Sequence, residues 1–152
     1  MQLAPIAPLT ALTTSGPSAA TADFNVHVQR TSQVDDDGVF TVDSQQVTLV
    51  PGNRDGGFVL RSTYFGGGVQ TNIRHIQGSD AERAAAQAVR DAIHASGLLA
   101  EARPSDRIGR PDVGLTRIYL DRHSSYVEFA NDHPTPAAQA VLDAVAAWAK
   151  LR

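Results

Sequence analysis

The 152-residue chain contains no cysteine, which excludes disulfide bonds, thiolate metal ligands and cysteine nucleophiles. It also has no run that approaches the ~20 apolar residues of a membrane-spanning helix, so we expect no membrane span. Basic charge is scarce: Lys150 is the one lysine beside twelve arginines, and the formal net charge is -3. Because nucleic-acid-binding proteins carry a basic surface, the composition predicts no nucleic-acid partner.

Charge is absent from residues 1–22, where three prolines also prevent a continuous helix. We interpret this segment as an arm that is flexible or docked on a partner. The tripeptide Ala20-Thr21-Ala22 has the small-x-small form of a signal-peptide cleavage site, but no basic segment precedes it and prolines interrupt the apolar stretch. An arm is therefore preferred to an export signal, and the cytoplasm to secretion.

Residues 23–152 are expected to form a single domain, in which alternating apolar and polar side chains predict a series of strands. The acidic turn that ends at Gly38 separates the first two strands, because Asp-Gly adopts the positive φ angles of a tight hairpin. Gly66, Gly67 and Gly68 form either a hairpin turn or a wide bulge. The predicted strands span residues 24–29, 39–42, 46–50, 58–65, 69–76, 115–120 and 126–129. Whether residues 23–55 extend the same sheet or form an added hairpin section stays open.

The first predicted helix has clear end signals. Ser79 and Glu82 form a capping box, in which each side chain accepts a hydrogen bond from the other residue's backbone N–H, and Gly97 ends the helix. Leu98 and Leu99 are then expected to return to the core. The helix is predicted to face inward with Ala81, Ala85, Ala88, Val89, Ala92 and Ile93, and outward with Arg83, Gln87, Arg90 and His94.

The last helix is predicted to begin with Thr135 as N-cap and Pro136 at the first helical position. Its apolar stripe is Ala138, Val141, Leu142, Val145, Trp148 and Ala149, so the one tryptophan is expected in the core. Strands followed by a helix, a hairpin and a second helix predict an α+β domain with two helices packed on one face of a mainly antiparallel sheet. The opposite face is left to solvent, to a partner or to the N-terminal arm.

Few residues suggest chemistry. The histidines show none of the i, i+2 or i, i+4 spacings that bring two imidazoles to one metal. We interpret all five as surface or turn residues: His27, His75, His94, His123 and His133. No phosphate-binding loop, dinucleotide fingerprint or metalloprotease motif is present. We therefore predict no catalytic residue, no metal ligand and no cofactor.

Two polar clusters are better explained as turns. Asp35, Asp36 and Asp37 are not followed by the glycine and the glutamate that a calcium-binding loop needs at its sixth and twelfth positions. Residues 121–124 are an Asp, an Arg, a His and a Ser in one hairpin turn, so their side chains point apart and do not form a catalytic relay. Neither cluster predicts a site.

Arginines fall repeatedly on or beside the predicted strands, at Arg30, Arg61, Arg74, Arg117 and Arg122. Several of them on the open face of the sheet would form a recognition surface for carboxylates on a partner. Ordinary solvated strand positions are the simpler explanation.

From residue 58 onwards the order of motifs is informative. The segment Leu60-Arg61-Ser62 leads into Gly66-Gly67-Gly68-Val69, and an Ala-rich helix with a Leu98-Leu99-Ala100 exit follows. The pattern ends with Ser125-Tyr126-Val127-Glu128-Phe129, Pro136 and the Val141-Leu142 helix. Over about 95 of the 152 residues, the chain resembles the emfourin-type inhibitors, small proteins that bind thermolysin-like metalloproteases. It differs in its third glycine, in the aromatic pair before the glycines and in residues 23–55.

The resemblance implies a protein that occludes a protease cleft without turnover. The glycine turn is the first candidate contact, because glycines allow close backbone approach and neighbouring aromatic side chains supply anchor area. Its residues are Tyr64, Phe65, Gly66, Gly67, Gly68 and Val69, and a second candidate is the loop 103–112 through Arg107 and Arg110. The partner is expected to be another protein, either a metalloprotease or copies of this chain. The alternative is a structural or assembly subunit, such as a particle or appendage component, docked through residues 1–22.

Overall fold

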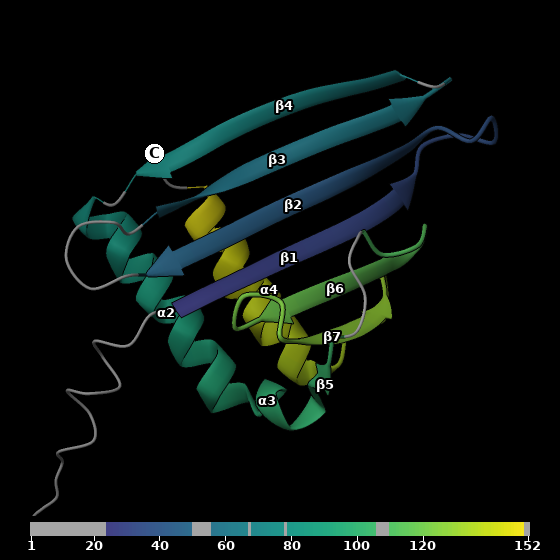
Figure 1. Ribbon diagram of the computed structural model, residues 1–152. Helices are drawn as coiled ribbons and strands as arrows, with labels where there is room; N and C mark the ends of the chain where they lie inside the picture. The colour runs from purple at the N-terminus through teal and green to yellow at the C-terminus, as the bar shows by residue number, and fades with distance from the viewer. Residues whose placement is uncertain (1–23, 50–55, 67, 78, 106–109, 151–152) are drawn as a thin grey trace, which may run out of the picture.

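The computed structural model describes residues 24–49, 56–66, 68–77, 79–105 and 110–150. These residues form a seven-stranded sheet with the strand order β4-β3-β2-β1-β6-β7-β5, together with three helices (Figure 1). All neighbouring strands are antiparallel. In chain order the elements are β1 (Phe24–Gln33), β2 (Phe40–Leu49), β3 (Gly56–Phe65), β4 (Gly68–Gln77), α2 (Asp80–Ser96), α3 (Leu98–Glu101), β5 (Arg103–Pro104), β6 (Leu115–Leu120), β7 (Ser125–Ala130) and α4 (Pro136–Ala149). The α+β class and the antiparallel sheet predicted from the sequence are confirmed.

The N-terminal strands lie in the middle of the sheet. β1 pairs with β2 on one side and with β6 on the other, so it joins the four-stranded meander β1–β4 to the second hairpin. The described residues of section 23–55 therefore extend the common sheet rather than form an added hairpin. In contrast, residues 1–22, interpreted as an arm, lie outside the described residues.

The prediction of two short strands at 39–42 and 46–50 is wrong, because β2 runs without a break from residue 40 to residue 49. The polar residues between the two predicted strands are stabilised by cross-strand partners. Arg61 Nε donates a hydrogen bond to Asp43 at 2.6 Å, and Gln29 Nε2 donates one to the buried Ser44 hydroxyl at 3.1 Å. A polar side chain with such a partner does not interrupt a strand.

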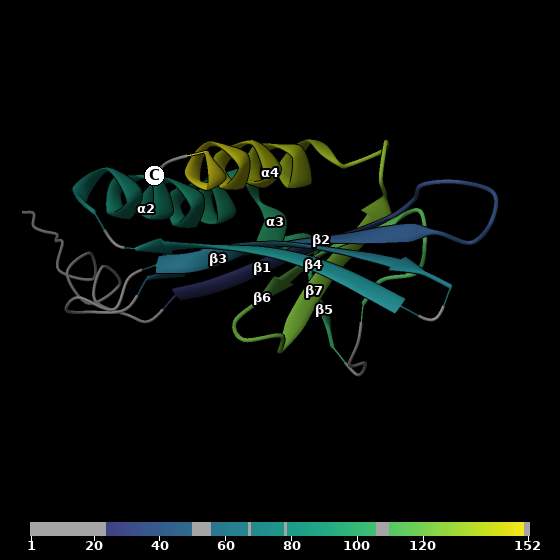
Figure 2. The ribbon, with the colours of Figure 1, turned by 90° about the horizontal axis from the view of Figure 1, so that it is seen from above.

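Figure 2 shows α2 and α4 side by side on the same side of the sheet. Between them and the strands lies the hydrophobic core, which includes Val26, Val47 and Ile118 from the sheet and Val89 and Val145 from the helices. Trp148 of α4 is completely buried, as the sequence predicts. The face of the sheet opposite the two helices is called the open face below.

The bounds of α2 agree with the sequence, and its buried face agrees in part, since Val89 and Ile93 are buried and Ala85 and Ala92 pack against the core. Ser79 Oγ accepts a hydrogen bond from the backbone N–H of Glu82, and Gly97 ends the helix at φ 83°. The buried residues are Glu82, Ala86, Val89, Arg90 and Ile93, whereas Ala81 and Ala88 are exposed. The prediction that Arg90 faces outward is therefore wrong. An alanine-rich helix has little apolar contrast between its faces, so the direction of its buried face is set by the sheet and by α4.

The exit from α2 also differs in part. Leu98 is completely buried, but Leu99 is half-exposed because successive residues of a helical turn point about 100° apart. The segment after it, predicted as a loop, contains β5, which pairs with β7. α4 begins as predicted, since the Thr135 hydroxyl accepts a hydrogen bond from the backbone N–H of Ala138. Within the described ranges, no helix has the length and apolar character needed to cross a membrane.

Candidate functional site

The β1–β2 connection and the β3–β4 connection lie at the same end of the sheet, away from α2 (Figure 1). The antiparallel register between β2 and β3 places Phe40 directly opposite Tyr64. Their rings stack with centroids 4.7 Å apart and planes 8° apart. The guanidinium carbon of Arg110 lies 4.3 Å from the centroid of the Phe40 ring, in a cation–π contact. Three segments that are distant in the sequence therefore converge on one aromatic stack.

Beside this stack the surface is hollowed. A hollow of about 300 Å³ is lined by Gly38, Phe40, Tyr64, Phe65, Gly66, Gly68 and Val69. The turn residue Gly66 has φ 45°, a left-handed conformation in which glycine avoids the steric penalty of a Cβ atom. Val69 is 55% exposed and Phe65 is 47% exposed, so apolar side chains border the hollow in contact with solvent.

Tyr64 and Phe65 do not form one aromatic anchor, because successive strand residues point to opposite faces of a sheet. Tyr64 shares the open face with Val69, its partner in the register, whereas Phe65 pairs with Gly68. We use the name hairpin-end surface for Phe40, Tyr64, Phe65, Gly66, Gly68, Val69 and Arg110. Next to the glycine turn, Tyr64 therefore lies on the open face of the sheet and Phe65 lies on the opposite face.

Most of the predicted contact residues lie in this surface. The structure brings Arg110 of the second candidate loop to the residues flanking the glycine turn, since Arg110 and Tyr64 line a common hollow. Gly67 and Arg107 lie outside the described residues. Sequence reasoning missed Phe40, whose importance depends on the pairing of β2 with β3. The spacing of residues along the chain contains no signal for that pairing.

A second hollow of about 420 Å³ continues from Tyr64 and Arg110 across the open face. Its lining consists of Gln29, Val42, Ser44, Leu60, Ser62, Tyr64, Arg110 and His123. The polar groups of this lining include hydroxyls, an amide, an imidazole and a guanidinium, but no carboxylate. The hollow can thus donate hydrogen bonds to an acidic group of a partner.

One residue of this lining, His123, contacts a second histidine, His27. Nδ1 of His27 lies 2.9 Å from Nε2 of His123, and the His123 ring stacks on Tyr119 with centroids 4.1 Å apart. His27 is only 8% exposed, so its interpretation as a surface or turn residue is wrong. Its position on a central strand, beneath the β6–β7 turn, explains the burial. His123 lies in a turn, as expected.

The pKa values of both histidines are lowered. Burial, followed by the charge of His123, lowers the pKa of His27 to about 4, and burial also lowers the pKa of His123. Nε2 of His27 is buried without a hydrogen-bond partner. The pair is therefore neutral near pH 7, and one ring donates the shared hydrogen bond to the other. In the described ranges, no group of three or more His, Cys, Asp or Glu side chains is placed to hold a metal ion.

The turn that carries His123 has an unusual backbone. Asp121, Arg122 and His123 have φ angles of 46°, 55° and 70°, all in the left-handed region that side chains other than glycine disfavour. Ser124 Oγ donates a hydrogen bond to Asp121 Oδ2 at 3.3 Å, while His123 points to His27 instead. The acid, the imidazole and the hydroxyl of this turn therefore do not form one chain of hydrogen bonds.

The arginines do not gather on the open face. Arg30 and Arg61 lie on the side of the sheet that carries the helices, where they pair with Asp132 and Asp43. Arg74 donates a hydrogen bond to the backbone oxygen of Ala149 in α4. On the open face, the buried Arg117 forms an ion pair with Glu128. The hypothesis of an arginine-rich carboxylate-binding surface is therefore wrong, because backbone alternation divides these residues between the two faces.

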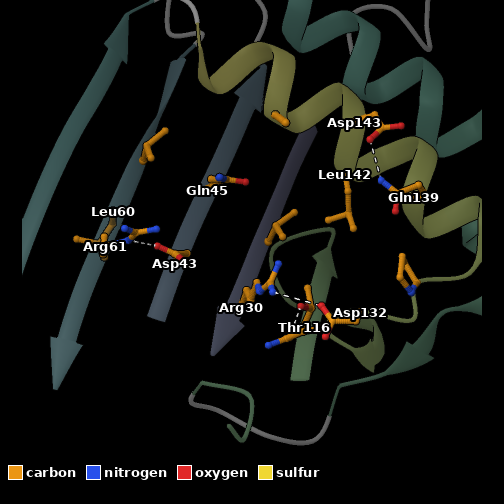
Figure 3. A pocket seen from close by; sticks show the side chains of 15 residues that line it. Arg30, Asp43, Gln45, Leu60, Arg61, Thr116, Asp132, Gln139, Leu142 and Asp143 are labelled. Carbon is orange, nitrogen blue, oxygen red and sulfur yellow. Dashed lines mark hydrogen bonds and ion pairs between the residues drawn. The ribbon is translucent and has the colours of Figure 1, made fainter. Parts of the chain in front are cut away.

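A larger hollow of about 660 Å³ lies between α4 and the neighbouring face of β1, β2 and β3. Figure 3 shows that its charged side chains point toward one another: Arg61 faces Asp43, and Arg30 faces Asp132. The Asp143 carboxylate accepts a hydrogen bond from Gln139. Two of the three carboxylates in the lining are thus paired with arginines, and Asp143 leaves the hollow with an excess of one negative charge.

Comparison with protein-family models, with curated proteins and with solved structures finds no match.

Proposed function

We propose that this chain is a non-catalytic protein-binding domain that contacts its partner through the hairpin-end surface. The observation that carries the proposal is the convergence of the Phe40–Tyr64 stack with the half-exposed side chains of Phe65 and Val69 around one turn. Aromatic residues dominate the energetics of protein interfaces because they bury a large area with little loss of conformational entropy. Stacking on Phe40 restricts Tyr64 before a partner binds, which lowers the entropic cost of association.

The proposed partner is a thermolysin-like metalloprotease, as the resemblance to emfourin-type inhibitors implies. In this proposal the glycine turn enters the protease cleft and blocks it without being cleaved. Gly66 and Gly68 carry no side chains, so the turn is narrow and its backbone can approach the cleft walls closely. Arg110 and the second hollow lie with Tyr64 on the open face of the sheet. In the proposal, their hydrogen-bond donors contact acidic groups at the rim of the cleft.

Titration against a thermolysin-like protease with a peptide substrate tests this proposal. One equivalent of the protein is expected to abolish cleavage of the peptide by the protease. Size-exclusion chromatography should show a one-to-one complex of the protein with the protease. The double variant Tyr64→Ala, Phe65→Ala is expected to weaken inhibition about 100-fold or more, because two interface anchors are lost. Its free energy of unfolding should stay within a few kcal/mol of that of the original chain, since Tyr64 is partly exposed and Phe65 is half-exposed.

The matched control is Leu99→Ala, which truncates a side chain of similar exposure on α3. This control should inhibit like the original chain. Full inhibition by the double variant would reject the hairpin-end surface as the contact. Failure of the original chain to inhibit would reject the protease as the partner.

The alternative function, a structural or assembly subunit docked through residues 1–22, depends on a segment outside the described residues. Removal of residues 1–22 separates the two functions. An inhibitor is expected to keep its activity and its mass, whereas an assembly held by the arm should dissociate. Light scattering of both chains at equal concentration measures the difference.

A further inference from the structure

β4 forms one edge of the sheet. It pairs with β3 over its whole length, and no strand in the described part of the chain pairs with its other side. A free edge presents backbone N–H and C=O groups that can accept another strand. The register with β3 is regular from Gly68 to Gln77, and this segment contains neither a bulge nor a proline. The opposite edge, β5, is only two residues long and contains Pro104. Of the two edges, β4 is therefore the one open to strand addition.

Two exposed apolar side chains lie on this edge. Val69 is 55% exposed and Ile73 is 58% exposed. Because side chains alternate along a strand, both point to the open face with Thr71 between them. Many proteins place a charged side chain on an edge strand where β4 has this exposed apolar pair.

The sequence of the edge is complementary to itself. If two copies pair in antiparallel fashion about a two-fold axis through Thr71, Val69 of each copy lies opposite Ile73 of the other. In the same register Gln70 lies opposite Asn72, and Gly68 lies opposite Arg74. Apolar residues thus face apolar residues, amides face amides, and no like charges oppose one another.

Other antiparallel registers also place the open faces of the two copies on the same side of the joint sheet. In those registers the two apolar residues do not lie opposite each other. Pairing about Asn72 places Ile73 opposite Thr71 and Val69 opposite His75. Pairing about Ile73 places Thr71 opposite His75 and Val69 opposite Gln77. From these comparisons we infer that the β4 edge binds a second copy of this chain, in antiparallel register about Thr71, to form one sheet across both copies.

α2 follows the end of β4 at which Ile76 is buried in the core, whereas the pairing segment extends toward the β3–β4 turn (Figure 1). The two-fold axis therefore places the α2 helices of the two copies toward opposite ends of the paired β4 strands. Contact through a single strand pair buries less than the ~1,600 Å² of a standard interface, so the dimer is expected to be weak.

Sedimentation equilibrium over a range of concentrations tests the dimer. The mass is expected to rise from one chain to two between about 1 µM and about 500 µM, the range of weak association. Ile73→Lys should keep the protein monomeric throughout, because it places a charge in the apolar pair. Leu99→Lys, at a similarly exposed site on α3, should still dimerise. A single-chain mass for the original protein at every concentration would overturn the inference.

The lack of cysteine allows a direct test of the register. Thr71→Cys is expected to form a disulfide-linked dimer under mild oxidation, because directly opposite residues have Cα atoms about 4.5–5.5 Å apart, within the range of a disulfide. Ile73→Cys should crosslink far more slowly, since the two equivalent positions lie four residues out of register. Faster crosslinking by Ile73→Cys would overturn the proposed register. Neither variant alters Tyr64, Phe65 or Arg110, so the result is independent of protease inhibition.

Discussion

Gly57 illustrates how one residue can be fixed by close packing. A Cβ atom at this position would lie 1.9 Å from the carbonyl oxygen of Gln46 and 2.8 Å from Cη2 of Trp148. Both neighbours are held in place, one by strand pairing and the other by complete burial. The side chain of the one tryptophan therefore reaches the β2–β3 backbone only because residue 57 has no side chain.

We predict that Gly57→Ala lowers the free energy of unfolding by about 3 kcal/mol, because overpacking forces the backbone and the indole apart. Urea denaturation measures this change. Gly68→Ala is the matched control: its Cβ would meet Phe65 at ordinary contact distances of 3.5 to 3.9 Å. The control should lose less than about 1 kcal/mol. Equal losses at both positions would contradict the packing argument.

The buried His27 predicts a pH dependence of stability. Its pKa is lowered to about 4 in the folded protein from 6.5, so between these values the unfolded chain binds more protons than the folded one. Stability is therefore complete above about pH 6.5 and falls as the pH drops toward 4. The lowered pKa of His123 acts in the same direction. We expect a loss of about 3 kcal/mol over this range from His27.

Denaturation of the original chain and of His27→Gln at several pH values checks this prediction. The difference in unfolding free energy between the two chains should shrink as the pH falls from 7 to 4. A constant difference between the original chain and His27→Gln would show that His27 titrates alike in both states.

Helix ends and strand pairing differ in how far the sequence can predict them. Ser79, Gly97 and Thr135 act on backbone groups within a few residues, so the helix boundaries follow from local patterns. Strand pairing depends on partners elsewhere in the chain. The stack of Phe40 on Tyr64 and the contact of His27 with His123 both require the register of β1, β2, β3 and β6, which no local pattern contains. The sequence therefore predicts every residue of the hairpin-end surface except Phe40, and it does not predict the contact between His27 and His123.

The cap of α4 gives a test of local signals. Thr135 accepts a hydrogen bond from the backbone N–H of Ala138 and donates one to Glu101 at 2.7 Å. Thr135→Ala is expected to destabilise the protein by about 1 kcal/mol, the usual cost of losing an N-cap. Thr135→Ser retains the hydroxyl and should recover most of this loss. Thermal unfolding of the three chains measures both effects. A serine variant as unstable as the alanine variant would show that the methyl group, not the cap, is responsible.

The whole domain depends on β1 as the link between its two halves. Residues 23–55 look like an addition to the part of the chain that carries the family resemblance, yet they supply the two central strands β1 and β2. A chain trimmed to residues 56–152 is therefore expected to lack a cooperative unfolding transition by circular dichroism, because β3 and β4 lose their connection to β6. A chain of residues 24–152 keeps every described element and should unfold cooperatively. Cooperative unfolding of the shorter chain would show that the first two strands are dispensable.

The central position of β1 also affects the order in which the strands of the sheet can pair during synthesis. β1 to β4 end at residue 77, but β6 begins only at residue 115. Ribosomes add about 5–20 residues per second, so several seconds pass between the synthesis of β1 to β4 and the synthesis of β6, which pairs with β1. Until then the central strand of the finished protein is an outer strand, with its backbone groups unpaired on one side. The nascent chain is thus most vulnerable to wrong pairing at the strand that is later the best protected.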